Sequence, residues 1–172
     1  MYNRPLRPNT MLSYSAGGAE TDHMRFRELA PNNRKLPLLL QRFAWLGAVF
    51  EGPPPVYVHA YPAPIEPVPG CVVVDSYMRE PTVARALVMA AARGHPAILA
   101  GQPLMVAELL LRHKLGSRPF PHTLLLVLGG YPCPRSLEAF LLGLAPVPMK
   151  ILYGYGVAEA GAAVLIGDSR SA

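Results

Sequence analysis

The chain has 172 residues, of which 51% are hydrophobic and 16% are charged, and it contains 20 prolines and 15 glycines. This apolar content supplies one hydrophobic core and excludes a chain that is disordered as a whole, whereas the prolines and glycines exclude a coiled coil or a bundle of long helices. The net charge of +5 is spread along the sequence, and nucleic acid is not expected as a partner, because proteins that follow a phosphate backbone concentrate their charge on one face.

The first 35 residues are polar and rich in turn-forming residues. We expect residues 1–35 to form an N-terminal arm with a loop of small residues, many of them Gly or Ser, at 13–21. Residues 36–172 are expected to fold as a single α/β domain. At its start, residues 36–50 predict a helix, because apolar side chains recur near helical spacing. Gly52 and the three prolines after it end that helix.

After this point short apolar runs alternate with helical patterns. The predicted strands are 56–60, 71–75, 97–100, 124–128, 150–153 and 163–166, and the predicted helices are 81–93, 103–115 and 134–144. A Pro-rich connection at 62–70 separates the first two strands. The alternation is typical of βαβ units, and continuous apolar strands suit a sheet that is covered on both sides. We therefore expect an α/β fold with a mostly parallel sheet and helices on both faces.

Two strand ends carry unusual residues, and ligands of parallel sheets bind beyond the carboxyl ends of strands. Gly129 and Gly130 follow the strand at 124–128, where they either let a ligand approach the backbone or form a tight turn into the next helix. Tyr155, Gly156 and Glu159 follow the strand at 150–153. An aromatic ring can stack on a base and a carboxylate can hold a metal bound to phosphates; the alternative is a Gly-rich turn with a solvated Glu.

The order and spacing of these two segments resemble the core of the adenylate-forming superfamily. This superfamily includes acyl-CoA synthetases, phenylacetate–CoA ligase-like enzymes and the adenylation domains of peptide synthetases. Its members carry a Gly-Gly turn followed by a Tyr-Gly-x-Thr-Glu motif, and here Tyr155 follows Gly130 by 25 residues. The strand at 97–100, followed by Gly101, Gln102 and Pro103 at the start of a helix, is also similar to the family's segment before the Gly-Gly turn.

The resemblance implies a binding site for ATP or AMP with Mg²⁺. Gly129 and Gly130 would line the adenine site, Tyr155 with Gly156 would pack against the adenine, and Glu159 would reach Mg²⁺ and phosphate. The family's phosphate loop would correspond to the small-residue loop, where backbone N–H groups and hydroxyls surround phosphates. Its candidate residues here are Ser13, Ser15, Gly17 and Gly18.

The sequence also departs from the family's pattern. Ala158 replaces the usual Thr, Ala16 and Gly17 stand where hydroxyl residues are usual, and no Lys follows the loop. The family's ribose-binding Asp, hinge and C-terminal domain with its catalytic Lys are expected to be missing after Ala172. Adenylation requires positive charge around the α-phosphate, so losing these groups costs several orders of magnitude in rate.

We therefore expect a truncated, catalytically incomplete homologue that acts as a binding or assembly module, as a homo-oligomer or with a partner protein. No catalytic residue is assigned. One alternative is half of an ATP-dependent carboxylate–CoA ligase that a partner completes in trans. Another is a simple ATP- or AMP-binding protein.

The remaining chemistry-bearing residues indicate little. Cys71 and Cys133 are not part of a Cys-x-x-Cys motif and read as reduced thiols of a cytoplasmic protein. The 5 histidines show no metal-ligand spacing. No transmembrane segment is expected, since no apolar stretch reaches the ~20 residues that a membrane helix needs.

Overall fold

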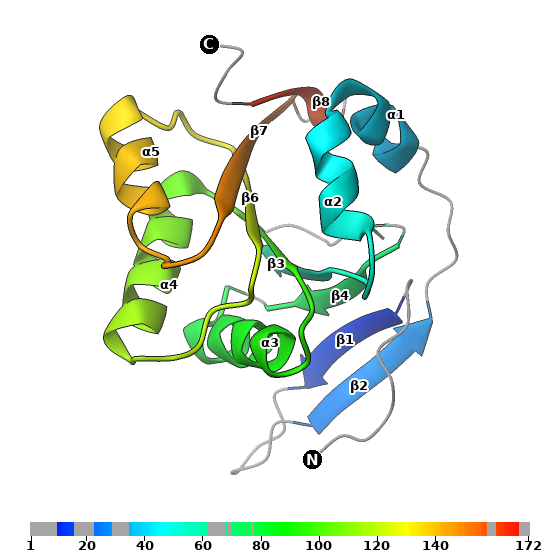
Figure 1. Ribbon diagram of the computed structural model, residues 1–172, viewed down its shortest axis with the longest axis vertical. Coiled ribbons are helices and arrows are strands. Elements are labelled where there is room, and N and C mark those ends of the chain that lie inside the picture. Colours follow the sequence, from blue (N-terminus) through cyan, green and yellow to red (C-terminus); the bar gives the residue numbers. More distant parts are fainter. Residues whose placement is uncertain are drawn as a thin grey trace.

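A computed structural model of the chain describes residues 10–15, 23–28, 35–61, 68, 70–76, 78–157 and 161–168. Its centre is an 8-stranded sheet with the strand order β2-β1-β4-β3-β5-β6-β7-β8 (Figure 1). The strands from β1 to β7 in this order run parallel to one another, and β2 and β8 join the two edges in the antiparallel direction. The mostly parallel α/β fold expected from the sequence is confirmed.

The strands are β1 (Thr10–Ser15), β2 (His23–Glu28), β3 (Val56–Ala60), β4 (Val72–Asp75), β5 (Ala97–Gly101), β6 (Leu124–Gly129), β7 (Met149–Val157) and β8 (Gly161–Asp168). The helices are α1 (Lys35–Arg42), the 3₁₀ helix η1 (Ala44–Leu46), α2 (Gly47–Phe50), α3 (Glu80–Ala92), α4 (Pro103–Leu115) and α5 (Arg135–Leu142). Within the part of the chain that the structure describes, no helix is long and apolar enough to cross a membrane.

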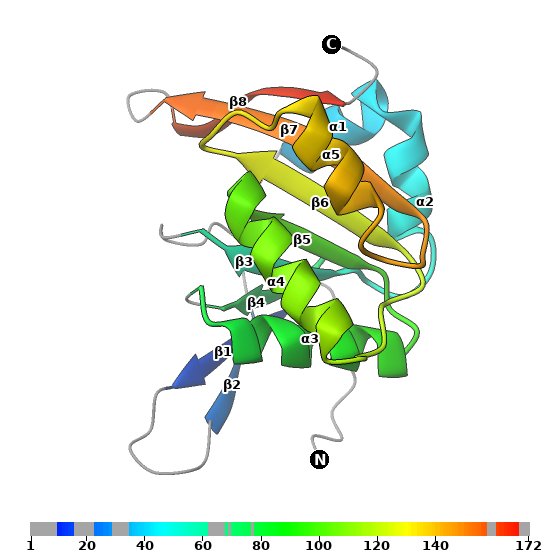
Figure 2. The same cartoon turned by 90° about the vertical axis from the view of Figure 1, so that its left-hand side faces the viewer.

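Helices cover both faces of the sheet, as expected: α3, α4 and α5 lie over one face, and α1 and α2 lie over the other (Figure 2). Successive side chains of a strand point to opposite faces. In β4, Val72 and Val74 therefore join the core beneath α3–α5, while Val73 joins the core beneath α1 and α2. Both faces of the central strands are buried, which is why these strands read as continuous apolar runs.

Several prolines stand at helix starts, where a missing N–H costs no hydrogen bond. Pro81 lies in the first turn of α3, Pro103 is the first residue of α4, and Pro134 is the N-cap of α5. The high proline content is thus compatible with a regular α/β core.

The helix expected over 36–50 is broken at Phe43. This residue leaves helical geometry (φ −120°, ψ 81°) between α1 and η1. Phe43 and Leu46 are 5% and 2% exposed and join the same core as Val49. With this break, all three side chains are buried against the sheet.

The start of the chain differs most from the expectation. Residues of the expected arm form β1 and β2, and β1 pairs in parallel with β4, so that Ser13 lies opposite Asp75. Ser13 and Ser15 therefore stand in a strand and not in a loop. Two serines are a weak local signal for a strand, so pairing decides this: β1 pairs with β2 along its whole length, and Thr10–Ser13 also pair with the buried strand β4. Gly17 and Gly18 lie outside the described residues.

Candidate functional site at the carboxyl edge of the sheet

The Gly-Gly segment and the Tyr155 segment meet on two neighbouring strands. Gly129 at the end of β6 pairs with Gly154 of β7, next to Tyr155. The sequence predicted a strand ending at residue 153, but β7 continues through Tyr155 and Gly156 because β8 pairs with it, with Tyr155 opposite Leu165. The turn and the aromatic residue of the motif thus lie side by side in the sheet, while Glu159 falls outside the described residues.

Gly129 is a glycine for steric reasons. It is buried, and an ideal Cβ there would lie 2.5 Å from the carbonyl oxygen of Gly154 and 3.0 Å from the hydroxyl of Tyr61. Contacts under 3 Å with backbone cannot be relieved by rotating a side chain. The absent side chain therefore permits the close approach of β6, β7 and the Tyr61 hydroxyl.

Gly130 has a different role. Its φ of +82° lies in the left-handed region that favours glycine, and the residue is exposed. A Cβ at this position would meet nothing closer than 3.6 Å, with Cγ and Nε2 of Gln102 at 3.6 and 3.9 Å and Cε1 of Tyr61 at 4.0 Å. The backbone of Gly130 is therefore accessible, and an amide and a phenol ring border it.

Tyr61 follows β3 and was not singled out from the sequence. Its hydroxyl donates a long hydrogen bond of 3.5 Å to the carbonyl of Val127, and its ring lies 5.7 Å from the ring of His59. Burial raises the pKa of Tyr61 to about 12. The hydroxyl therefore stays protonated at neutral pH and can act as a hydrogen-bond donor. An aromatic residue at the carboxyl end of a predicted parallel strand is the signal that could have identified it.

Gln102 is the second residue that the sequence reasoning did not assign to the site. It is the N-cap of α4, with extended backbone (φ −71°, ψ 141°), and its side chain does not cap the helix. Its place is fixed by its neighbour Gly101, where a Cβ would lie 2.8 Å from Cγ2 of Val106 and 3.3 Å from the carbonyl oxygen of Ala60. The backbone at Gln102 is thus tightly held, and its half-buried side-chain amide makes no capping hydrogen bond to α4.

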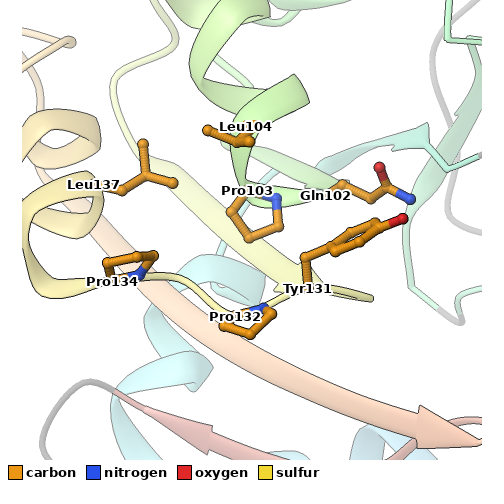
Figure 3. A pocket seen from close by; sticks show the side chains of 7 residues that line it. All are labelled: Gln102, Pro103, Leu104, Tyr131, Pro132, Pro134 and Leu137. Atoms are coloured by element: carbon orange, nitrogen blue, oxygen red, sulfur yellow. The ribbon is translucent and has the colours of Figure 1, made fainter.

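A pocket of about 470 Å³ opens beside this turn, between the start of α4 and the β6–α5 connection (Figure 3). It is lined by Gln102, Pro103, Leu104, Tyr131, Pro132, Pro134 and Leu137. In Figure 3 the amide of Gln102 and the hydroxyl of Tyr131 point to the same side, away from Leu137. The pocket therefore has a polar end next to Gly130 and an apolar end toward α5, and its volume suits a small organic ligand.

Cys133 lies between two prolines that line the pocket, and Tyr153 of β7 is nearby. Burial, reinforced by the carboxylate of Glu138, raises the pKa of Tyr153. Burial likewise raises the pKa of the Cys133 thiol. A thiol whose pKa is raised is mostly protonated at neutral pH and is a poor nucleophile, so Cys133 does not have the environment of a catalytic cysteine.

The structure does not bring all the expected residues together. Ser15 ends β1 at the carboxyl edge, but β4, β3 and β5 lie between β1 and β6. At the usual spacing of strands, β1 is roughly 19 Å from β6. Among the described residues there is no group of three or more His, Cys, Asp and Glu that could hold a metal ion. The described part of the expected site is therefore the Gly129–Gly130 turn with the neighbouring segment of β7.

No protein-family model matches the chain, and no curated protein matches it.

Proposed function

We propose that the protein binds an adenine nucleotide at the carboxyl edge of its sheet and serves as a binding or assembly module similar to the core of adenylate-forming enzymes. The observation that carries this proposal is the pairing of Gly129 with Gly154. It brings the Gly-Gly turn next to Tyr155, the arrangement that the resemblance requires, at the edge where parallel sheets bind ligands.

The character of the pocket favours binding over catalysis. Its lining residues are all uncharged, and five of the seven are proline or leucine. Transfer of an adenylyl group develops negative charge that cations or metal ions must stabilise. An uncharged lining offers hydrogen bonds and apolar contact to a base but little stabilisation of such a transition state.

Calorimetric titration with AMP and with ATP plus Mg²⁺ tests the proposal. We expect saturable binding at one site per chain and a loss of affinity in Tyr155→Ala. The matched control is Phe50→Ala, which removes a half-buried ring on α2, over the opposite face of the sheet from α4 and α5. Absence of heat with both nucleotides, or equal affinity in the two variants, would contradict the proposed site. Titration of ATP with and without Mg²⁺, in the native chain and in Glu159→Gln, tests whether Glu159 carries the metal.

Exposed apolar side chains on the helical face support the assembly part of the proposal. Outside the pocket lining, Leu115 is 74% exposed on α4, and Leu111, Phe140 and Leu142 are 37%, 46% and 41% exposed on α4 and α5, which pack together. Apolar patches of this kind are typical of protein interfaces. We propose a homo-oligomer or a stable complex with a partner in the cytoplasm. Sedimentation as a monomer, with no partner recovered in pulldowns, would contradict this part.

A further inference from the structure

Gly130 is exposed, and one group with paired hydrogen-bonding capacity lies beside it. Gln102 is the nearest side chain to an added Cβ, with Cγ at 3.6 Å and Nε2 at 3.9 Å from its position. A carboxamide offers an acceptor and two N–H donors on adjacent atoms. Tyr61, at 4.0 Å, adds a ring edge. A ligand over Gly130 therefore meets an amide edge and an aromatic ring together.

The amide of Gln102 is available for a ligand. It does not cap α4, and it makes no hydrogen bond to another residue in the part of the chain that the structure describes. It is only half-buried, at the polar end of the pocket. Gly101 and Pro103 on either side are buried and hold its backbone in place. Such a residue can contribute a directed hydrogen bond with little loss of backbone entropy.

The chemistry of the amide matches one kind of ligand edge. A 6-aminopurine presents an amino donor next to a ring nitrogen acceptor, and glutamine pairs with such an edge through two hydrogen bonds. We infer that Gln102 recognises the base of the bound nucleotide, with its amide oxygen accepting a hydrogen bond from the 6-amino group and its N–H donating to the adjacent ring nitrogen. This inference rests on the proposed function, because it names a specificity-determining residue for the same site.

A binding experiment that varies both the residue and the ligand separates direct contact from an indirect effect. The two ligands are AMP and purine riboside 5′-monophosphate, which lacks the amino group. The two proteins are the native chain and Gln102→Met, in which a side chain of similar length makes no such hydrogen bonds. We expect the native chain to prefer AMP by about tenfold, and Gln102→Met to bind both ligands with equal affinity.

Two further variants control for folding and for general effects. Gln102→Glu keeps an acceptor for the amino group but loses the donor, so it should bind AMP more weakly while still preferring it. Gln41→Met is the matched control, because Gln41 is exposed on α1, which covers the opposite face of the sheet from α4. Its ligand preference should equal that of the native chain, and thermal melting confirms that each variant is folded.

The outcomes distinguish the two proposals. If the native chain binds neither ligand, the proposed function is wrong and this inference falls with it. If the native chain binds AMP but Gln102→Met keeps the native preference for the amino group, the site stands and the role of Gln102 is wrong. Loss of the preference in Gln102→Met, together with its retention in Gln102→Glu and Gln41→Met, supports the inference.

Discussion

The carbonyl oxygen of Gly154 occupies the space that a side chain on Gly129 would need, since an ideal Cβ on Gly129 would lie 2.5 Å from it. The two residues are paired across β6 and β7. Any side chain at position 129 therefore has to push the two strands apart at the edge where we propose that the nucleotide binds.

Gly129→Ala should accordingly destabilise the fold, by at least about 2 kcal/mol, because the clash involves backbone atoms that cannot rotate away. Two other glycines serve as controls, since nothing lies within 4 Å of a Cβ at Gly47 or Gly94. Gly47→Ala, in helical geometry, should be neutral or stabilising by up to about 1 kcal/mol. Gly94→Ala, at φ +68°, should cost about 1 kcal/mol from backbone strain alone. Urea unfolding measures all three, and a loss of stability in Gly129→Ala no larger than that in Gly94→Ala would show that β6 and β7 can separate freely.

His113 makes stability depend on pH. It is 1% exposed at the end of α4, with Nε2 2.9 Å from the carbonyl oxygen of Pro119 and its ring edge-on to Phe120. Burial lowers the pKa of His113 in the folded state; nearby Arg118 acts in the same direction, and the Pro119 hydrogen bond and Glu80 oppose them. As the pH falls, the imidazole of His113 is protonated in the unfolded chain at about pH 6.5, before it is protonated in the folded protein. The stability that is present above pH ~6.5 is therefore lost progressively as the pH falls toward the lowered pKa.

Replacing His113 with Gln should reduce the loss of stability between pH 7 and pH 5, because Gln does not titrate. The matched control is His122→Gln, which removes an exposed histidine and should leave the pH dependence of the native chain unchanged. Denaturant unfolding at both pH values gives the comparison. A native chain that is equally stable at pH 5 and pH 7 would contradict the prediction.

Two leucines of α4 separate core packing from surface assembly. Leu110 is 0% exposed on the buried face of α4, and Leu115 is 74% exposed on the same helix. Leu110→Ala should cost about 2–5 kcal/mol of stability, because it leaves a cavity. Leu115→Ala should change stability by less than about 0.5 kcal/mol, yet shift the sedimentation coefficient if the helical face forms an interface. A large loss of stability in Leu115→Ala with an unchanged sedimentation coefficient would mean that Leu115 is buried against its own chain in solution.

The two thiols should react very differently. Cys71 is 0% exposed, and burial raises its pKa to about 12, so it should react with a thiol reagent only after unfolding. Cys133 is half-buried with a raised pKa, so it should react slowly in the native protein and faster as the pH rises and thiolate forms. Counting modified thiols with and without denaturant measures this, and Cys133→Ser should abolish the native reaction. Fast labelling of two thiols in the native protein would contradict it.

Nucleotide should protect Cys133. The prolines on both sides of this cysteine, Pro132 and Pro134, line the pocket beside Gly130. A saturating concentration of AMP should therefore slow labelling of Cys133, while labelling of Cys71 in denaturant is unaffected. An unchanged rate would mean that a bound nucleotide does not cover the β6–α5 connection.

The sequence by itself determined the α/β class, and it did so through local signals. Prolines at helix starts, glycines at helix ends and continuous apolar runs are read over a few residues, so α3, α4 and the central strands agree closely with the predicted ranges. The position of Tyr155, 25 residues after Gly130, was also visible in the sequence.

Only the tertiary structure decided what depends on residues far apart in the chain. Ser13 and Ser15 belong to a strand because β1 pairs with β2 along its length and, from Thr10 to Ser13, with β4. The helix is interrupted at Phe43, whose ring joins a buried core. Gln102 and Tyr61 border Gly130 because three parallel strands end at one edge. Strand pairing and burial connect residues that no short window of sequence contains. For that reason the sequence predicted Gly129, Gly130 and Tyr155 as site residues but did not predict Gln102 and Tyr61.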